Sequence, residues 1–198
     1  MKIVIVGASG TIGKQIVSAL EKEHEVIRVG SKSGDVQADI TDPASLENMF
    51  RQLKSFDALV SATGAAYFGP WEQTTDLEYR IGVNSKLMGQ VNLVLIGQHY
   101  INPKGSFTLT SGILAHDPVR GGSNASMVNG AINSFVKAAS VELKDGVRIN
   151  AVSPNVVEDS PEYFPFFPGE IPVTMKEVTA AYVKSVLGAA TGKVLEIH

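Results

Sequence analysis

The stretch Gly7-Ala8-Ser9-Gly10-Thr11-Ile12-Gly13 decides the fold of this chain. It follows an apolar run at residues 2–6, which predicts a buried strand, and it opens residues 12–23, where apolar side chains recur at helical spacing. Glycines in such a turn let the backbone approach a pyrophosphate, which the N–H groups at the helix start then bind. The spacing is Gly-x-x-Gly-x-x-Gly, and the alternative is a glycine-rich turn without a ligand. We expect dinucleotide contacts from Gly7, Ser9, Gly10, Thr11, Ile12 and Gly13.

The rest of the chain alternates short β-branched runs with amphipathic stretches. Further strands are expected at residues 25–29, 36–40, 57–61, 105–110, 147–152 and 193–197. Helices are expected after Asp42-Pro43, over 75–100 as one or two helices, and over 123–143 and 176–187. Repeated strand–helix–strand units predict an α/β fold, a single Rossmann-like, doubly wound parallel sheet of about seven strands with helices on both faces. No linker is visible, so we expect one domain over residues 1–198.

Composition excludes several classes of function. The chain has 198 residues and no cysteine, which excludes disulfides, thiolate metal sites and cysteine nucleophiles. The net charge is −3, without a block of lysine or arginine, so nucleic acid and anionic membranes are not expected partners. No apolar run approaches the ~20 residues of a membrane span, and the four histidines are too scattered for a metal site. We expect a cytoplasmic protein without a metal.

The end of the second strand bears on the choice of cofactor. An acidic residue there would accept a hydrogen bond from the ribose 2′-hydroxyl and favour NAD. This chain has Ser31 and Lys32 at that place and no acid, so we expect both to bind a 2′-phosphate. The prediction is NADP(H), with NAD(H) less favoured, and the alternative for Lys32 is an exposed lysine in a polar turn. Asp39 is expected to accept from the adenine amino group or, alternatively, to cap the turn before Asp42.

With these residues the chain resembles the short-chain dehydrogenase/reductase family over nearly its whole length. Ala38-Asp39-Ile40 is similar to the family's adenine contact, and Ser61-Ala62-Thr63-Gly64 stands where the family has Asn-Asn-Ala-Gly. Residues 147–154 resemble the strand before its Pro-Gly motif, although Asn155 replaces that glycine. The resemblance implies that Gly64 and Pro154 are further cofactor contacts.

The family's active site uses Asn, Ser, Tyr and Lys, and the resemblance implies Asn84 as the first of these. Aligning residues 131–143 with the active-site helix puts Ala125 at the Tyr position and Asn129 at the Lys position. Ala125 cannot transfer a proton, and Asn129 carries no charge, although it can hydrogen-bond a ribose and is therefore expected to contact the cofactor. The Ser position falls at Gly112, with Ser111 one residue earlier.

Three functions remain open from the sequence. The first is an NADP(H)-dependent oxidoreductase of a small carbonyl or alcohol, in which the expected catalytic residues are Asn84, organising water, and Ser111, polarising the carbonyl. A non-standard donor would give the proton; His116 is one candidate, although an exposed loop histidine is the plainer interpretation. The second is a binding module that keeps the dinucleotide without the chemistry. The third is a structural subunit that binds no nucleotide and pairs with an active relative.

Two further expectations concern surfaces. Residues 158–172 carry four aromatic residues and four prolines, which predicts an ordered, extended loop that walls a substrate or contacts a second subunit. The resemblance also implies a homodimer or homotetramer, formed through the helices at residues 84–100 and 123–143.

Overall fold

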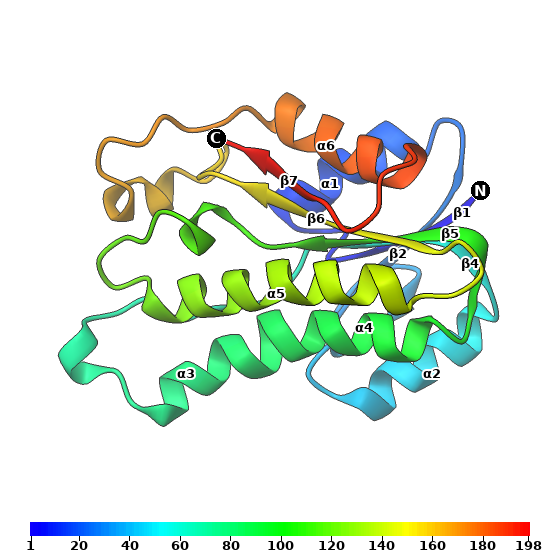
Figure 1. Cartoon of the computed structure of the whole chain (residues 1–198), viewed down its shortest axis with the longest axis horizontal. Coiled ribbons are helices and arrows are strands. Elements are labelled where there is room, and N and C mark those ends of the chain that lie inside the picture. The colour runs from blue at the N-terminus through cyan, green and yellow to red at the C-terminus, as the bar shows by residue number, and fades with distance from the viewer.

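The computed structural model describes all of residues 1–198 and shows one parallel sheet of seven strands (Figure 1). The strand order is β3-β2-β1-β4-β5-β6-β7. The strands are β1 (Lys2–Val6), β2 (Glu25–Gly30), β3 (Val36–Gln37), β4 (Phe56–Ser61), β5 (Ile101–Thr110), β6 (Arg148–Pro154) and β7 (Val194–Ile197). The expected fold class is thereby confirmed.

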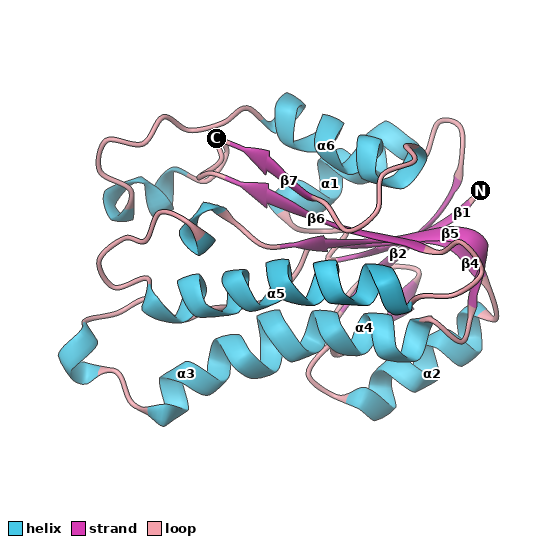
Figure 2. Ribbon diagram, viewed as in Figure 1, coloured by secondary structure: helices cyan, strands magenta, loops and turns pink.

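Helices cover both faces of this sheet (Figure 2). The α-helices are α1 (Thr11–Leu20), α2 (Pro43–Leu53), α3 (Asp76–Gly82), α4 (Gln90–Gly97), α5 (Ser123–Glu142) and α6 (Met175–Leu187). Val4 and Val6 of β1 pack with α2, α4 and α5, whereas Ile3 and Ile5 pack with α1 and α6. Side chains of a strand alternate between faces, so this uninterrupted apolar run supplies two cores at once.

The strand order reverses next to β1, which pairs with β2 on one side and β4 on the other. In an open α/β sheet the crevice outside the carboxyl ends of the strands at such a switch point is where ligands bind. The glycine loop follows β1 at this edge, and residues 61–66 follow β4. The fold therefore brings together the segments from which a site was expected.

The region expected to be one or two helices forms one continuous helical run from α3 to α4. Thr75 and Glu78 close its start as a capping box. Between α3 and α4 lies a π-helical segment, η2 (Val83–Gly89). π-Helical turns are rare and occur frequently at functional sites, so η2 marks this part of the run for closer attention.

Two local expectations need correction. The third strand ends at Gln37 rather than at residue 40, because the Asp39 carboxylate accepts hydrogen bonds from the Thr41 N–H and hydroxyl and turns the chain. Residues 158–172 are not extended throughout, since Pro161–Phe166 form a 3₁₀ helix, η4. Pro161 begins that helix, where a missing N–H costs no hydrogen bond.

Two further 3₁₀ turns complete the structure, η1 (Trp71–Gln73) and η3 (Ile113–Ala115). None of the helices combines the length and the apolar character that crossing a membrane requires.

Candidate functional site

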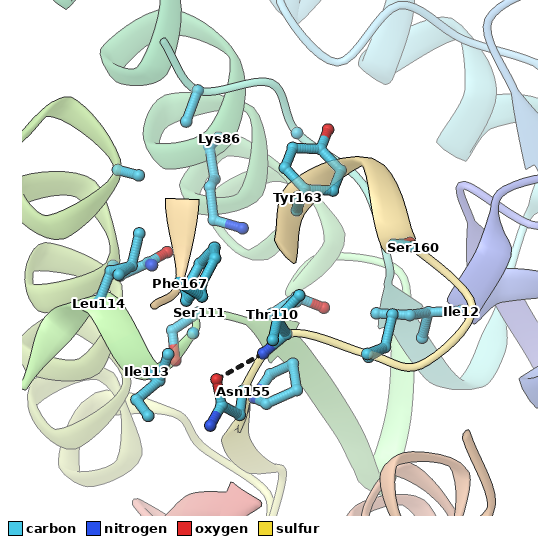
Figure 3. Close-up of a pocket in the computed structure, with 18 of the residues that line it drawn as sticks. Ile12, Lys86, Thr110, Ser111, Ile113, Leu114, Asn155, Ser160, Tyr163 and Phe167 are labelled. Atoms are coloured by element: carbon cyan, nitrogen blue, oxygen red, sulfur yellow. Dashed lines mark hydrogen bonds between the residues drawn. The ribbon is translucent and has the colours of Figure 1, made fainter. Parts of the chain in front are cut away.

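Two neighbouring hollows lie at the carboxyl edge of the sheet and share Gly64 and Ala65. The first, here named the glycine-loop groove, has a volume of about 390 Å³ and lies between the ends of β1, β2 and β4. The second, the inner pocket, has a volume of about 370 Å³ and lies between β5, β6, η2 and α5 (Figure 3). Because they share residues, one elongated ligand can extend from the groove into the pocket.

The glycine loop has the close packing that its sequence predicts. Gly7 adopts a φ of +84°, and a Cβ there would collide with the Ala62 carbonyl. A Cβ on Gly13 would collide with the Gly7 carbonyl, so only glycine lets α1 start this close to the loop. Both positions therefore require glycine for reasons of conformation and space.

The start of α1 leaves backbone donors without partners. Gly10 is the N-cap residue, and no side chain caps the helix. The first intrahelical hydrogen bond runs from the Lys14 N–H to the Gly10 carbonyl, at 3.0 Å. The N–H groups of Thr11, Ile12 and Gly13, together with the positive end of the helix dipole, form a cradle that fits a pyrophosphate.

Most of the residues expected to contact the dinucleotide line one of the two hollows. The groove is lined by Gly7, Ser9, Gly10, Ser31, Asp39 and Gly64. The inner pocket is lined by Ile12, Gly64, Ser111, Asn129 and Pro154. Thr11 and Gly13 line neither, and Gly13 has the packing role described above.

Lys32 and Asp39 lie at the outer end of the groove. Lys32 is exposed and is not one of the lining residues. Asp39 lines the groove, and the hydrogen bonds from the Thr41 N–H (2.8 Å) and hydroxyl (2.7 Å) lower the pKa of its carboxyl. Asp39 therefore forms the turn that was one of its two expected roles, and its carboxylate stays at the edge of the groove.

The inner pocket contains buried polar atoms without protein partners. Ser111 is 3% exposed and Asn129 is 4% exposed. The Ser111 Oγ and the Asn129 Oδ1 make no hydrogen bond within the protein. A buried polar group without a partner costs about 1–3 kcal/mol. Atoms of this kind in a pocket fit a site whose polar partners come from a ligand.

Lys86 of η2 is a pocket residue that the sequence analysis missed (Figure 3). Gln90 fixes its backbone, since the Gln90 Nε2 donates to the carbonyl oxygens of Lys86 (3.0 Å) and Thr110 (2.8 Å). The Gln90 Oε1 accepts from the Thr110 N–H at 2.8 Å. Gly64 packs against the Lys86 backbone, where a Cβ would come within 2.7 Å of its Cα. The end of β5 and the loop after β4 therefore hold Lys86 in place.

The surroundings of Lys86 change its acidity. The residue is partly accessible, but the protein around its side chain displaces water and lowers its pKa to about 8. A sequence signal for this residue exists, because Lys86 is the only Asp, Glu, Lys or Arg between Arg80 and Lys104. The signal is weak, because lysine is usually exposed and a lone lysine in a helix most simply faces solvent.

The structure separates two other candidates from the pocket. Asn84 is exposed and does not line either hollow. His116 is also exposed, and its Nε2 lies 3.1 Å from the Glu196 Oε1 of β7. Neither side chain is placed where it reaches a ligand of the inner pocket, so the expected water-organising role of Asn84 is not supported by its position.

Aromatic side chains form the outer wall of the inner pocket. Tyr163 lies in η4 and Phe167 directly follows it, and both line the pocket together with Phe68. The Phe68 ring packs against Tyr163 at 6.2 Å and against Phe166 at 5.5 Å between centroids. Residues 158–172 thus provide the wall that their composition predicted.

The comparisons with known proteins agree with this architecture. A family model described as enoyl-(acyl carrier protein) reductase matches residues 1–163. A hydroxynaphthalene reductase of Aspergillus fumigatus is 27% identical over 155 residues, which is 75% of this chain. The chain spans 57% of the length of that reductase. The chain belongs to the short-chain dehydrogenase/reductase family.

Two solved structures are similar over the whole chain. The protein lin1944 from Listeria innocua is 48% identical, with a TM-score of 0.98 and complete coverage of both chains. A small-chain dehydrogenase solved in complex with NADPH is 25% identical, with a TM-score of 0.88, and the match covers 100% of this chain and 96% of that one.

Proposed function

We propose that this protein is an NADP(H)-dependent oxidoreductase that acts on a small carbonyl or alcohol. The observation that carries the proposal is the junction of the two hollows at Gly64 and Ala65. One hollow offers the unpaired N–H groups of α1, and the other offers the unpartnered atoms of Ser111 and Asn129. The similar dehydrogenase solved with NADPH supports the choice of ligand.

The residues present fit a nicotinamide dinucleotide. The glycine loop and the start of α1 would hold the pyrophosphate, and Ser31 and Lys32 would hold the 2′-phosphate. Asn129 and Pro154 line the inner pocket and would contact the nicotinamide end. When bound, NADPH supplies a hydride for the reduction of a carbonyl carbon.

The chain's own contribution to such a reaction lies in the inner pocket. The Ser111 hydroxyl would donate a hydrogen bond to the substrate oxygen and stabilise the charge that develops there. Tyr163 and Phe167 would exclude water from the reacting atoms. Ala125 stands at the position that the family resemblance gives to the tyrosine proton donor. It lines the pocket, is 4% exposed and has no proton to transfer. The proton would then come from another pocket group or from a single water molecule held beside the substrate oxygen.

The first experiment titrates nucleotide-free protein with NADPH, NADP⁺, NADH and NAD⁺ by calorimetry. The expected result is tighter binding of the two phosphorylated forms. If none of the four binds, the oxidoreductase proposal is wrong and a structural role remains.

The second experiment follows NADPH oxidation with a panel of small aldehydes, ketones and 2-oxo acids. The Ser111→Ala variant is expected to lower kcat, because removing one donor to a developing oxyanion costs roughly 10²–10³-fold in rate in well-studied enzymes. His116→Ala is the matched control and should leave the rate unchanged. Tight NADPH binding without turnover of any substrate would instead favour a binding module, in agreement with Ala125 at the place of the proton donor.

A further inference from the structure

Lys86 is the one charged side chain among the 20 residues that line the inner pocket, and 11 of the 20 are hydrophobic. Figure 3 shows its side chain directed into the pocket, with its amino group between Tyr163 and Phe167. The Lys86 Nζ takes part in none of the protein's ion pairs, so no carboxylate lies within 4.0 Å of it. An ammonium ion in such surroundings lacks the partner that buried charges normally have.

Hydrogen bonds and close backbone packing fix the position of this lysine. The Gln90 side chain joins the Lys86 carbonyl to the end of β5, and Gly64 packs against the Lys86 Cα. Lys86 lines the pocket while Asn84, two residues earlier on η2, faces solvent, because residues two apart lie on different sides of a helix. The cationic group is therefore anchored in the pocket wall rather than free on a surface.

The polar atoms near the sheet complement this charge. The Ser111 Oγ and the Asn129 Oδ1 are buried and have no partner, and both residues line the same pocket as Lys86. The pocket thus presents a positive charge from η2, hydrogen-bonding groups from β5 and α5, and an apolar wall from residues 163–167. A ligand that fits this arrangement has an anionic group, a further oxygen that accepts from the Ser111 hydroxyl, and an apolar body.

We propose that the inner pocket binds a small apolar carboxylate, with the carboxylate paired to the Lys86 ammonium and the apolar body against Tyr163 and Phe167. As a substrate class, an apolar oxo acid or hydroxy acid, this inference rests on the proposed function. As a binding site for a carboxylate, it stands on the pocket alone. A neutral isostere offers the ammonium only a dipole, whereas a carboxylate adds the attraction between opposite charges, so the charged ligand is favoured.

The acidity of Lys86 gives the site a pH dependence. Because burial lowers its pKa to about 8, Lys86 is charged at neutral pH and loses its charge as the pH rises through 8. Tyr163 is the only other titratable residue that lines the pocket, and the Glu170 carboxylate, which does not line it, accepts from the Nδ2 of the pocket residue Asn155. Carboxylate affinity should fall about thirty-fold between pH 7 and 9.5, as linkage requires when only the protonated lysine binds the anion.

The test uses benzoate as the carboxylate and benzamide as its neutral isostere, titrated by calorimetry into the full chain without nucleotide. Wild-type protein should bind benzoate at least tenfold more tightly than benzamide. At pH 8, repeating the titration in buffers of different ionisation enthalpy should show proton uptake, because the bound anion raises the pKa of Lys86.

Three variants separate the charge of Lys86 from general effects. Lys86→Met should lower benzoate affinity at least tenfold and leave benzamide affinity unchanged. Lys86→Arg should keep the affinity and remove its fall above pH 8, since arginine stays charged. Lys137→Met removes the same charge from an exposed position on α5 and should behave as wild type.

The possible outcomes distinguish this inference from the proposed function. Equal binding of benzoate and benzamide, or unchanged benzoate binding in Lys86→Met, would overturn the inference while NADPH binding still supports the oxidoreductase. If Lys86→Met instead weakens NADPH and leaves benzoate unaffected, Lys86 serves the cofactor and the inference is again wrong. Benzoate binding in a protein that binds no dinucleotide would support the carboxylate site and contradict the oxidoreductase.

Discussion

At the scale of single residues, the proposed preference for NADP(H) over NAD(H) assigns the 2′-phosphate contact to Lys32. Its side chain is exposed beside the groove, so its contribution to a phosphate is that of a solvated contact, about 1 kcal/mol. Lys32→Ala should weaken NADPH roughly fivefold and leave NADH affinity unchanged. Calorimetric titration of both nucleotides measures this, and an equal loss for both would remove Lys32 from the 2′-phosphate site.

Gly13 provides a second test at this scale. Replacing glycine by alanine inside a helix normally stabilises it by about 0.5–1 kcal/mol. At Gly13 the new Cβ would collide with the Gly7 carbonyl, so Gly13→Ala should lower the free energy of unfolding and weaken NADPH binding. In urea unfolding, the control Gly130→Ala on α5 has no atom within 4 Å of its Cβ and should be stabilised. The same sign for both variants would contradict this explanation of the loop.

At the scale of elements, Arg148 of β6 fixes the end of α6. Its guanidinium donates to the carbonyl oxygens of Ser185 and Val186, each at 2.9 Å, where the helix leaves its last carbonyls unpaired. Arg148→Met should lower the free energy of unfolding by about 1–3 kcal/mol, the usual cost of leaving such groups unsatisfied. Urea unfolding measures the loss, with Arg51→Met on the exposed surface of α2 as the control expected to change little.

Also at this scale, the helical run from α3 to α4 shows what the sequence could and could not predict. The glycine loop and the two cores on either side of β1 were predictable, because buried strands and tight turns have strong local signals. The π-helical form of η2 was not, since its hydrogen bonds span five residues rather than four and change which side chains face inward. The family resemblance pointed to Asn84, whose side chain is exposed, and no strong local pattern pointed to Lys86, which lines the pocket.

The 3₁₀ helix η4 is a smaller example of the same limit. Its prolines predicted an extended loop, yet Pro161 suits the first position of a helix as well as it suits a loop. Whether a helix or an extended loop is adopted depends on the packing of Tyr163 and Phe166 against Phe68, a residue almost 100 positions earlier. Contacts of that kind are not visible in a local pattern.

At the scale of the whole molecule, α4 and α5 lie side by side on one face of the sheet (Figure 1). Both helices carry exposed apolar side chains. Leu95 is 47% exposed and Met127 is 43% exposed. We expect these helices to pair two chains in a homodimer or within a homotetramer, and Leu95→Glu should then lower the mass measured by light scattering. Ile171→Glu, at an exposed apolar residue outside both helices, should leave the mass unchanged. A wild-type protein with the mass of one chain would contradict the expected dimer.

The two hollows also differ in when they can form during synthesis. Every residue that lines the glycine-loop groove lies between Val6 and Ser85, whereas the inner pocket needs residues as far as Phe167. Chains are synthesised from the N-terminus at about 5–20 residues per second. A nascent chain therefore acquires the lining of its dinucleotide groove seconds before the last wall of the inner pocket is translated. Nucleotide present at that stage would meet its cradle first and stabilise the half of the sheet on which the rest of the molecule assembles.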